Sequence, residues 1–241
     1  MNPKNYKYAG LAGAGMLVVI VVMAIYLFRA GTPRVVPDAS RPAPDVPSIK
    51  AQAERGNAAM QNALGDLYAK GEGVPQSFGE ALKWYRTAAE KGFADAQYNL
   101  AVLYETGLGV TRDEIEAAKW HRKAAEQGHA GAAYNLAAMY AMGRGVPRDA
   151  TEAAKFYRLA AEQGDALAQY NLARRHEVGK GVSVDRIEAY KWHKLASRQG
   201  MEDAAQALAN LKSQMTREEI SEGERRAGAF VVKKPAAASS Q

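Results

Sequence analysis

Residues 94–128 read ADAQYNLAVLYETGLGVTRDEIEAAKWHRKAAEQG, and the chain contains four versions of this stretch, spaced 36 residues apart. A fixed period of this size indicates one supersecondary unit stacked on copies of itself, rather than a single globular core. The large aromatic position of the stretch recurs at Trp84, Trp120, Phe156 and Trp192, its turn glycines at Gly71/Gly73, Gly107/Gly109, Gly143/Gly145 and Gly179/Gly181, and the next valine at Val74, Val110, Val146 and Val182.

Each unit is predicted to form two helices joined by its Gly-x-Gly turn, because glycine supplies the left-handed residue that ends a helix. We expect the second helix to open with a capping box. In such a box the first side chain accepts a bond from a free backbone N–H, and a glutamate three residues later reaches back to the N–H of the cap. The four boxes are Ser77/Glu80, Asp113/Glu116, Asp149/Glu152 and Asp185/Glu188.

The packing faces repeat with the turns. On the first helix, Leu100, Ala101 and Tyr104 form an apolar face with one small residue, which permits close approach of a neighbour. On the second helix, small residues surround Trp120. This combination allows neighbouring helices to interdigitate, which an isolated hairpin cannot do.

The pattern A-x-x-x-LA-x-x-Y-x-x-G-x-GV-x-x-D-x-x-EA-x-x-W-x-x-x-AAEQG resembles the Sel1-like repeat, a relative of the tetratricopeptide repeat. The resemblance covers about residues 51–230. It implies an all-α fold, a right-handed α-solenoid whose concave face binds proteins, and for bacterial members frequent export or association with the cell envelope. The predicted divisions are a repeat region at 51–215 with units at 58–93, 94–129, 130–165 and 166–201, a capping helix at 216–230 that starts with a Thr216/Glu219 box, and a disordered low-complexity tail at 231–241.

The segment before the repeats indicates a membrane anchor. After a polar tail at 1–7, residues 8–28 (Tyr8 to Phe28) contain no charge, and as a helix they would span about 31 Å, enough for a hydrocarbon core. A cleaved signal peptide is the competing interpretation, but the apolar run is long and no small-x-small cleavage pattern follows it. Small residues near its start permit helix dimerisation, although such patterns are mostly incidental. Residues 29–50, rich in proline, are predicted to be a semi-rigid linker.

The orientation of the anchor in the membrane is read from the charges that flank it, and lysines and arginines flank both ends of residues 8–28. A short tail with two lysines is usually retained in the cytoplasm. We therefore expect a single-pass inner-membrane protein with a cytoplasmic N-terminus and a periplasmic repeat domain.

The net charge of +6 does not indicate nucleic-acid binding. The chain has 32 Lys and Arg against 26 Asp and Glu, but residues 51–230 carry 24 of each kind. The excess therefore lies around the apolar run and in the tail, whereas a nucleic-acid footprint would lie on the folded surface. We interpret it as membrane flanking.

The sequence offers no catalytic constellation. It has no cysteine, no H-E-x-x-H and no G-x-S-x-G, so we expect no enzyme activity, cofactor or metal. His121 and His193 occupy one register, where the other units have Tyr85 and Tyr157, and we expect this position to be half-exposed and aromatic rather than metal-binding.

The resemblance to the tetratricopeptide repeat implies that the first helix of each unit lines the concave face, so a binding face is expected there. Tyrosine provides rigid amphipathic contact area, and asparagine can pair with an extended peptide backbone. The alternative is that the asparagines bond the adjoining unit and the tyrosines pad the stack. The candidate residues are Tyr98, Asn99, Tyr134, Asn135, Tyr170 and Asn171.

Unit four departs from the pattern, because Arg174 and Arg175 replace Val102 and Leu103 of unit two. One interpretation is a patch that recognises anions beside Tyr170. The other is a looser end of the stack, in which Arg175 snorkels or pairs with the acidic C-terminal helix through Glu218 or Glu222.

Together these observations predict a non-catalytic, membrane-anchored scaffold or regulator that binds a protein or peptide, with an envelope or membrane protein as partner. The alternatives are an envelope hydrolase or cell-wall-binding protein, and an adaptor that faces the cytoplasm.

Overall fold

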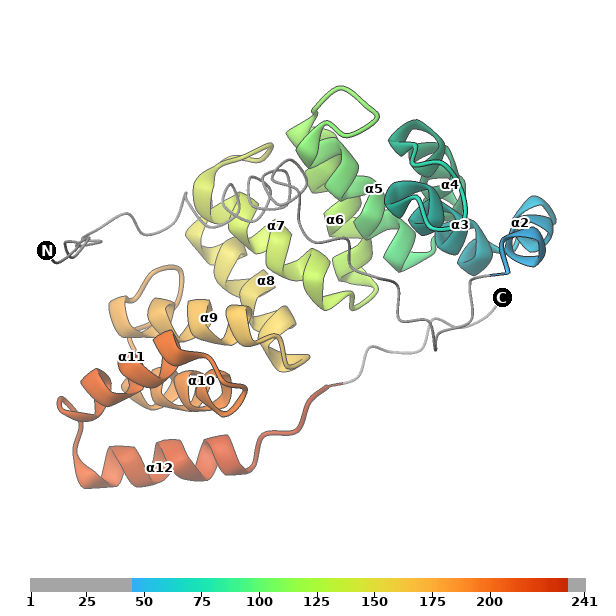
Figure 1. The fold of residues 1–241 in the computed structure, drawn as a ribbon. Coiled ribbons are helices and arrows are strands. Elements are labelled where there is room, and N and C mark those ends of the chain that lie inside the picture. Colours follow the sequence, from blue (N-terminus) through green and yellow to red (C-terminus); the bar gives the residue numbers. More distant parts are fainter. Residues whose placement is uncertain (1–44, 234–241) are drawn as a thin grey trace, which may run out of the picture. The chain divides into compact units, whose positions relative to one another are not determined.

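The computed structural model describes residues 45–233, which fold into helices joined by short turns (Figure 1). The helices in this part of the chain are α2 (Val46–Glu54), α3 (Ala58–Lys70), α4 (Phe78–Glu90), α5 (Ala94–Thr106), α6 (Glu114–Glu126), α7 (Ala130–Met142), α8 (Ala150–Glu162), α9 (Ala166–Val178), α10 (Arg186–Arg198), α11 (Glu202–Lys212) and α12 (Arg217–Gly228).

The helices stack as four successive hairpins. Unit one contains α3 and α4, unit two α5 and α6, unit three α7 and α8, and unit four α9 and α10. Within each unit the first helix packs on the second, and each second helix packs on the first helix of the next unit. At one end α2 packs on α3, and at the other both α11 and α12 pack on α10 (Figure 1). The predicted all-α solenoid is confirmed.

The two glycines of each turn are needed for different reasons. The first glycine of each turn ends its helix in a left-handed conformation, with φ of 76° at Gly107 and 74° at Gly143. In units two to four, the second glycine leaves room for the backbone of the previous unit. A Cβ atom would lie 2.0 Å from the Glu114 carbonyl oxygen at Gly145, and 1.9 Å from that of Ala150 at Gly181. No residue with a side chain fits at these two positions.

The capping boxes form only in part. As predicted, the side chains of Ser77, Asp113, Asp149 and Asp185 accept bonds from the first turn of α4, α6, α8 and α10. The reciprocal bond from the glutamate was predicted wrongly, because the N–H of each cap already donates to a carbonyl of the preceding helix, as Asp113 does to Tyr104 at 2.9 Å. Glu116 instead pairs with Lys119. Among residues 45–233, only Thr216 of α12 has the complete box, with Glu219.

Buried small residues form the core together with one leucine from each first helix. Leu64, Leu100, Leu136 and Leu172 are fully buried, as are the alanines around them. At Gly65 a Cβ would lie 2.5 Å from the Tyr85 ring. Small residues therefore set how closely the helices approach, and the aromatic rings fill the remaining space.

Glutamines join consecutive units. Gln97 donates to the Ala89 carbonyl at the end of α4, and Gln127 donates to Gln97. Two units later, Gln169 donates to the Ala161 carbonyl and Gln199 donates to Gln169 in the same way. Gln97 and Gln169 each give a second hydrogen bond to a carbonyl in the last turn of the preceding unit, so the joint between units is a hydrogen-bonded contact as well as an apolar one.

At the N-terminal end, α2 begins at Val46, inside the segment 29–50 that was predicted to be a linker. The predicted tail 1–7 and the predicted anchor 8–28 lie outside the described residues. Within residues 45–233, no helix combines the length and apolar character needed to cross a membrane.

At the C-terminal end, α12 matches the predicted capping helix and lies across α10. The chain then leaves the helix and runs toward the end of α8. Residues 231–233 were predicted to start a disordered tail, yet Lys233 donates its backbone N–H to the Glu162 carbonyl at 2.9 Å. The remainder of that predicted tail, residues 234–241, lies outside the described residues.

Candidate protein-interaction face

The three predicted tyrosines form a row along the first helices of units two to four. Tyr98, Tyr134 and Tyr170 are half-buried. Each ring lies over the ring at one fixed register of the second helix in its own unit, with centroid distances of 5.6 Å to His121, 5.7 Å to Tyr157 and 5.5 Å to His193. The row therefore pads the hairpins and also keeps part of each ring accessible. We call these three residues the tyrosine row.

Burial raises the pKa of the Tyr98 and Tyr134 hydroxyls. Both stay protonated at neutral pH, so each can donate or accept a hydrogen bond. The ring of His129, which caps α7, also stacks on Tyr98 at 4.5 Å.

The asparagines beside the row already have partners within the solenoid. Asn99 donates to Asn62 at 3.0 Å and to Asp66 at 3.3 Å, both in unit one. Nδ2 of Asn135 lies 3.4 Å from Nε2 of His121 in unit two. Asn171 bonds to Leu167 in its own helix. Two of the three thus bridge adjoining units, and their part in ligand binding stays a prediction.

The two consecutive arginines of unit four have different environments. Arg174 is exposed, and its only hydrogen bond in the described residues is a long one of 3.5 Å to the Tyr170 hydroxyl. Arg175 is buried over the Tyr157 ring and donates to the carbonyls of Ala150 and Lys180. Arg174 can therefore reach a ligand, whereas Arg175 holds the turn.

The suggested pairing of Arg175 with the C-terminal helix is wrong. Glu222 pairs with Arg225 and Arg226 of its own helix. Arg175 finds carbonyl acceptors nearer to it in the chain, so it needs no carboxylate.

The histidine register is a buried polar site that the sequence reading missed. His121 and His193 are fully buried rather than half-exposed. Nε2 of His121 lies 3.5 Å from a carboxylate oxygen of Glu105, which also binds Arg144 at 2.7 Å. His193 pairs with Glu177 in the same way. Burial raises the pKa of Glu105, but His121 and Arg144 outweigh it and leave that pKa below its ordinary value.

A signal for these pairs is present in the sequence. The two units with histidine in the second helix have glutamate at one position of the first helix, Glu105 and Glu177. The two units with tyrosine there have alanine at the same position, Ala69 and Ala141. The two positions vary together within one chain, which is expected of residues in contact.

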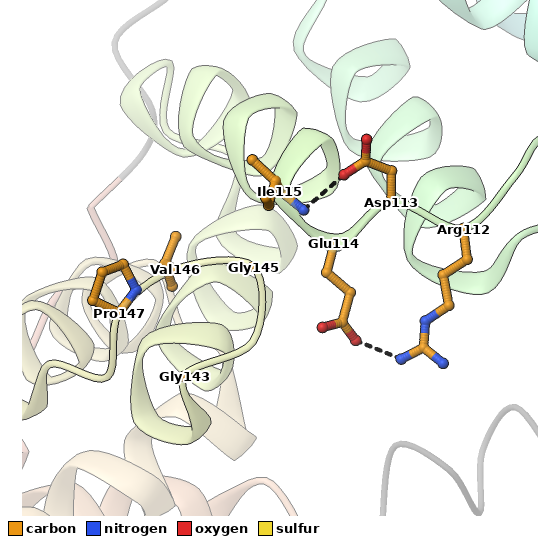
Figure 2. Close-up of a pocket in the computed structure, with 8 residues that line it drawn as sticks. All are labelled: Arg112, Asp113, Glu114, Ile115, Gly143, Gly145, Val146 and Pro147. Carbon is orange, nitrogen blue, oxygen red and sulfur yellow. Dashed lines mark hydrogen bonds and ion pairs between the residues drawn. The ribbon is translucent and has the colours of Figure 1, made fainter.

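A shallow depression of about 690 Å³ lies where the turn of unit three meets the start of α6 (Figure 2). Its polar groups already have structural tasks, since Asp113 caps α6 and Glu114 pairs with Arg112. Ile115 lies exposed at its rim. In the part of the chain that the structure describes, no group of three or more histidines and carboxylates is arranged to hold a metal.

Comparison with known proteins agrees with this geometry. The family model of the Sel1 repeat matches residues 58–93, 94–129, 130–165 and 166–201, more than half of the chain. These are the four predicted units. Among curated proteins, none matches the chain.

Two crystal structures are similar. A Sel1 repeat protein from Oxalobacter formigenes has a TM-score of 0.68 and 31% sequence identity, over 87% of this chain and 85% of that protein. The protein c5321, a protective antigen of uropathogenic Escherichia coli strains with an SLR fold, has a TM-score of 0.53 and 27% identity. That match covers 89% of this chain and 52% of c5321, so this chain spans about half of it.

Proposed function

The chain belongs to the Sel1 repeat family, and from this premise we propose that it is a non-catalytic scaffold that binds a protein or peptide along its first helices. Sel1 repeat proteins generally mediate protein–protein interaction, and their solenoid is typically an interaction scaffold. The observation that carries the proposal here is the tyrosine row, which ends at an exposed arginine, Arg174, on α9.

The charges at the two ends of the row favour one direction of binding. Asp95, exposed at the start of α5, lies near the Tyr98 end, where its carboxylate is 3.7 Å from His129. Arg174 lies at the Tyr170 end and forms no ion pair in the described residues. A partner with a basic group at one end and an acidic group at the other would be complementary to this row.

The buried polar groups support a scaffold rather than an enzyme. His121, His193 and their glutamates are paired with each other inside the hairpins. A general base must lie within hydrogen-bond reach of a substrate proton, and both histidine rings are closed off from solvent.

Site-specific photo-crosslinking in cells tests the binding face. A benzoylphenylalanine at position 174, on a first helix, should capture a protein partner. The same residue at position 155, an exposed lysine on the second helix α8, is the matched control and should capture much less. Arg174→Glu should reduce capture of the identified partner, and Arg174→Lys should reduce it less. Equal capture at both positions would place the partner elsewhere.

We further propose that residues 8–28 anchor the protein in the inner membrane and that the repeats lie in the periplasm. The support is the uncharged run of 21 residues, flanked by lysines and arginines. Protease treatment of intact spheroplasts should digest the repeats, whereas protection until lysis would place them in the cytoplasm. If N-terminal sequencing finds that the mature protein starts near residue 31, residues 8–28 belong to a cleaved signal peptide and not to an anchor.

A further inference from the structure

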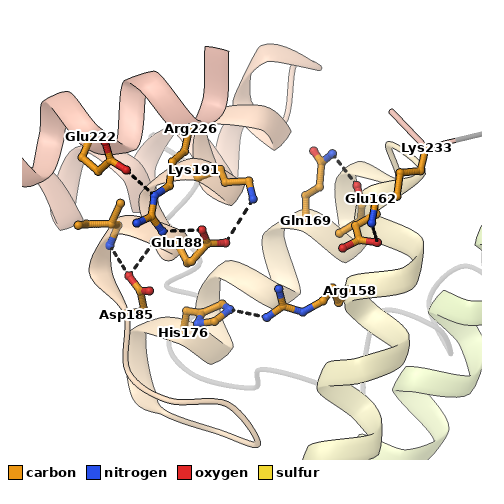
Figure 3. A network of polar contacts seen from close by, with 12 residues as sticks. Arg158, Glu162, Gln169, His176, Asp185, Glu188, Lys191, Glu222, Arg226 and Lys233 are labelled. Atoms are coloured by element: carbon orange, nitrogen blue, oxygen red, sulfur yellow. Dashed lines mark hydrogen bonds and ion pairs between the residues drawn. The ribbon is translucent and has the colours of Figure 1, made fainter. Parts of the chain in front are cut away.

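The chain after α12 lies on the solenoid itself, and Figure 3 shows its contact between Lys233 and Glu162. Phe230 packs edge-on against the Trp192 ring of α10, with 5.5 Å between ring centroids. Three residues later, Lys233 reaches the end of α8, where its ammonium lies 2.8 Å from the Glu162 carboxylate and its backbone N–H binds the carbonyl of the same residue. We call residues 229–233 the C-terminal segment, and Trp192, Glu162 and Gly164 its docking surface.

Only two side chains anchor this segment. Val231 is 79% exposed and Val232 is 51% exposed, although Val232 passes over Gly164, which has no side chain to obstruct it. A segment with two anchors and an exposed middle buries little apolar area, so its contact with the solenoid is weak compared with the helix packing beside it.

The docking surface has features that this segment does not fully use. The indole Nε1 of Trp192 is buried and has no acceptor among the described residues, and an unpaired buried donor is costly. Glu162 lies in the last turn of α8, where the helix dipole favours a cation. A ligand suited to this surface would therefore keep the cation that Lys233 already brings to Glu162 and add a hydrogen-bond acceptor for Trp192.

Glu162 also belongs to a series. The equivalent residues at the ends of α4 and α6 are Glu90 and Glu126, which are exposed and form no ion pair in the described residues. In the docking surface the ring lies one unit after the glutamate, at Trp192, and the rings in that register after Glu90 and Glu126 are Trp120 and Phe156, which are both buried. The carboxylate of the docking surface therefore recurs along the second helices, whereas its ring has a segment lying on it in unit four.

We propose that the docking surface is a second peptide-binding surface, separate from the tyrosine row, and that the C-terminal segment occupies it as a displaceable internal ligand. The partner it fits is an extended peptide with an aromatic residue followed, three positions later, by a lysine or arginine. This surface lies on second helices, so the proposal does not depend on the function proposed for the first helices.

Competition between the internal segment and an added peptide provides the test. The probe is a fluorescein-labelled peptide with the sequence of residues 227–236, AGAFVVKKPA, added to the full chain in detergent micelles. A tethered segment competes at an effective concentration of roughly millimolar, so we expect its removal to tighten peptide binding by about tenfold or more. Fluorescence anisotropy measures the affinity.

Two variants free the surface in different ways. One ends at Gly228, and the other keeps the full length but carries Phe230→Ser with Lys233→Ser, so it serves if the shortened chain does not fold. Val231→Ser, at an exposed position, is the matched control and should bind as weakly as the unaltered chain. Adding Glu162→Gln to the full-length variant should weaken binding of the peptide severalfold. Changing the peptide at the position of Lys233 to Glu, or at that of Phe230 to Ala, should have the same effect.

Three results would overturn the proposal. The first is equal binding by the unaltered chain and both freed variants, and the second is binding that ignores the Phe and Lys of the peptide. The third is a dimer of the unaltered chain, seen by light scattering and lost on cutting at Gly228, which would assign the surface to the segment of a second copy.

Discussion

Units two and three form the same hairpin with different chemistry at one buried register. Unit two places His121 there and pairs it with Glu105, whereas unit three places Tyr157 there and has Ala141 opposite. Both rings are buried, and both lie under a member of the tyrosine row. The helix geometry thus tolerates a polar pair or an apolar pair at this register, but the polar pair makes its unit depend on a partner residue and, through the lowered pKa of Glu105, on pH.

The largest effect should follow from Glu105→Ala. This change leaves His121 fully buried and removes the main carboxylate partner of Arg144, and loss of one member of a buried pair costs about 3 kcal/mol. Urea unfolding of the purified chain measures the loss. The corresponding change in unit four, Glu177→Ala, is the control and should cost less, because Glu177 is 27% exposed. Equal costs would mean that neither the deeper burial of Glu105 nor its contact with Arg144 adds to stability.

A smaller effect should appear on acidification. The pKa of Glu105 is lowered in the folded state from its ordinary value of 4.5. Its stabilising contribution is therefore complete above about pH 4.5 and is lost as the pH falls through the folded pKa. Thermal unfolding between pH 7 and pH 3 should show that the melting temperature of the unaltered chain falls more steeply with pH than that of Glu105→Gln. Parallel curves would contradict the lowered pKa.

The smallest effect should come from converting unit four to the apolar solution. Glu177→Ala with His193→Tyr recreates the Ala141/Tyr157 pair of unit three. We expect a stability within about 1 kcal/mol of the unaltered chain, since replacement of a buried polar pair by well-packed apolar groups is often neutral. Urea unfolding compares the double variant with Glu177→Ala alone. A double variant less stable than the single one would show that the two registers are not interchangeable.

The repeated features could be predicted from the sequence because each depends on residues close together in the chain. The Gly107 turn, the side-chain cap at Asp113 and the unit boundaries all follow from local backbone requirements. Each of these signals occurs four times at the same spacing, which distinguishes it from a chance match.

The missed features depend on contacts between distant residues. The backbone N–H of Asp113 donates to the Tyr104 carbonyl across the turn, nine residues earlier in the chain, which the local box pattern cannot indicate. The C-terminal segment occurs once in the chain, and its partner Glu162 lies seventy-one positions before Lys233. At the binding face, the pattern identified the tyrosine row but not that Arg174 is exposed while Arg175 is buried.

The close approach at the second glycine of each turn also governs how such an array can change in length. The turn of each unit must carry a glycine where it meets the unit before it, as Gly145 and Gly181 do. After α11 the chain has Ser213 and Gln214 instead of a Gly-x-Gly turn. An added copy of residues 166–201 would bring its own glycines and could join the series before residue 202. Gene duplication can therefore lengthen this protein one unit at a time without altering the residues on either side.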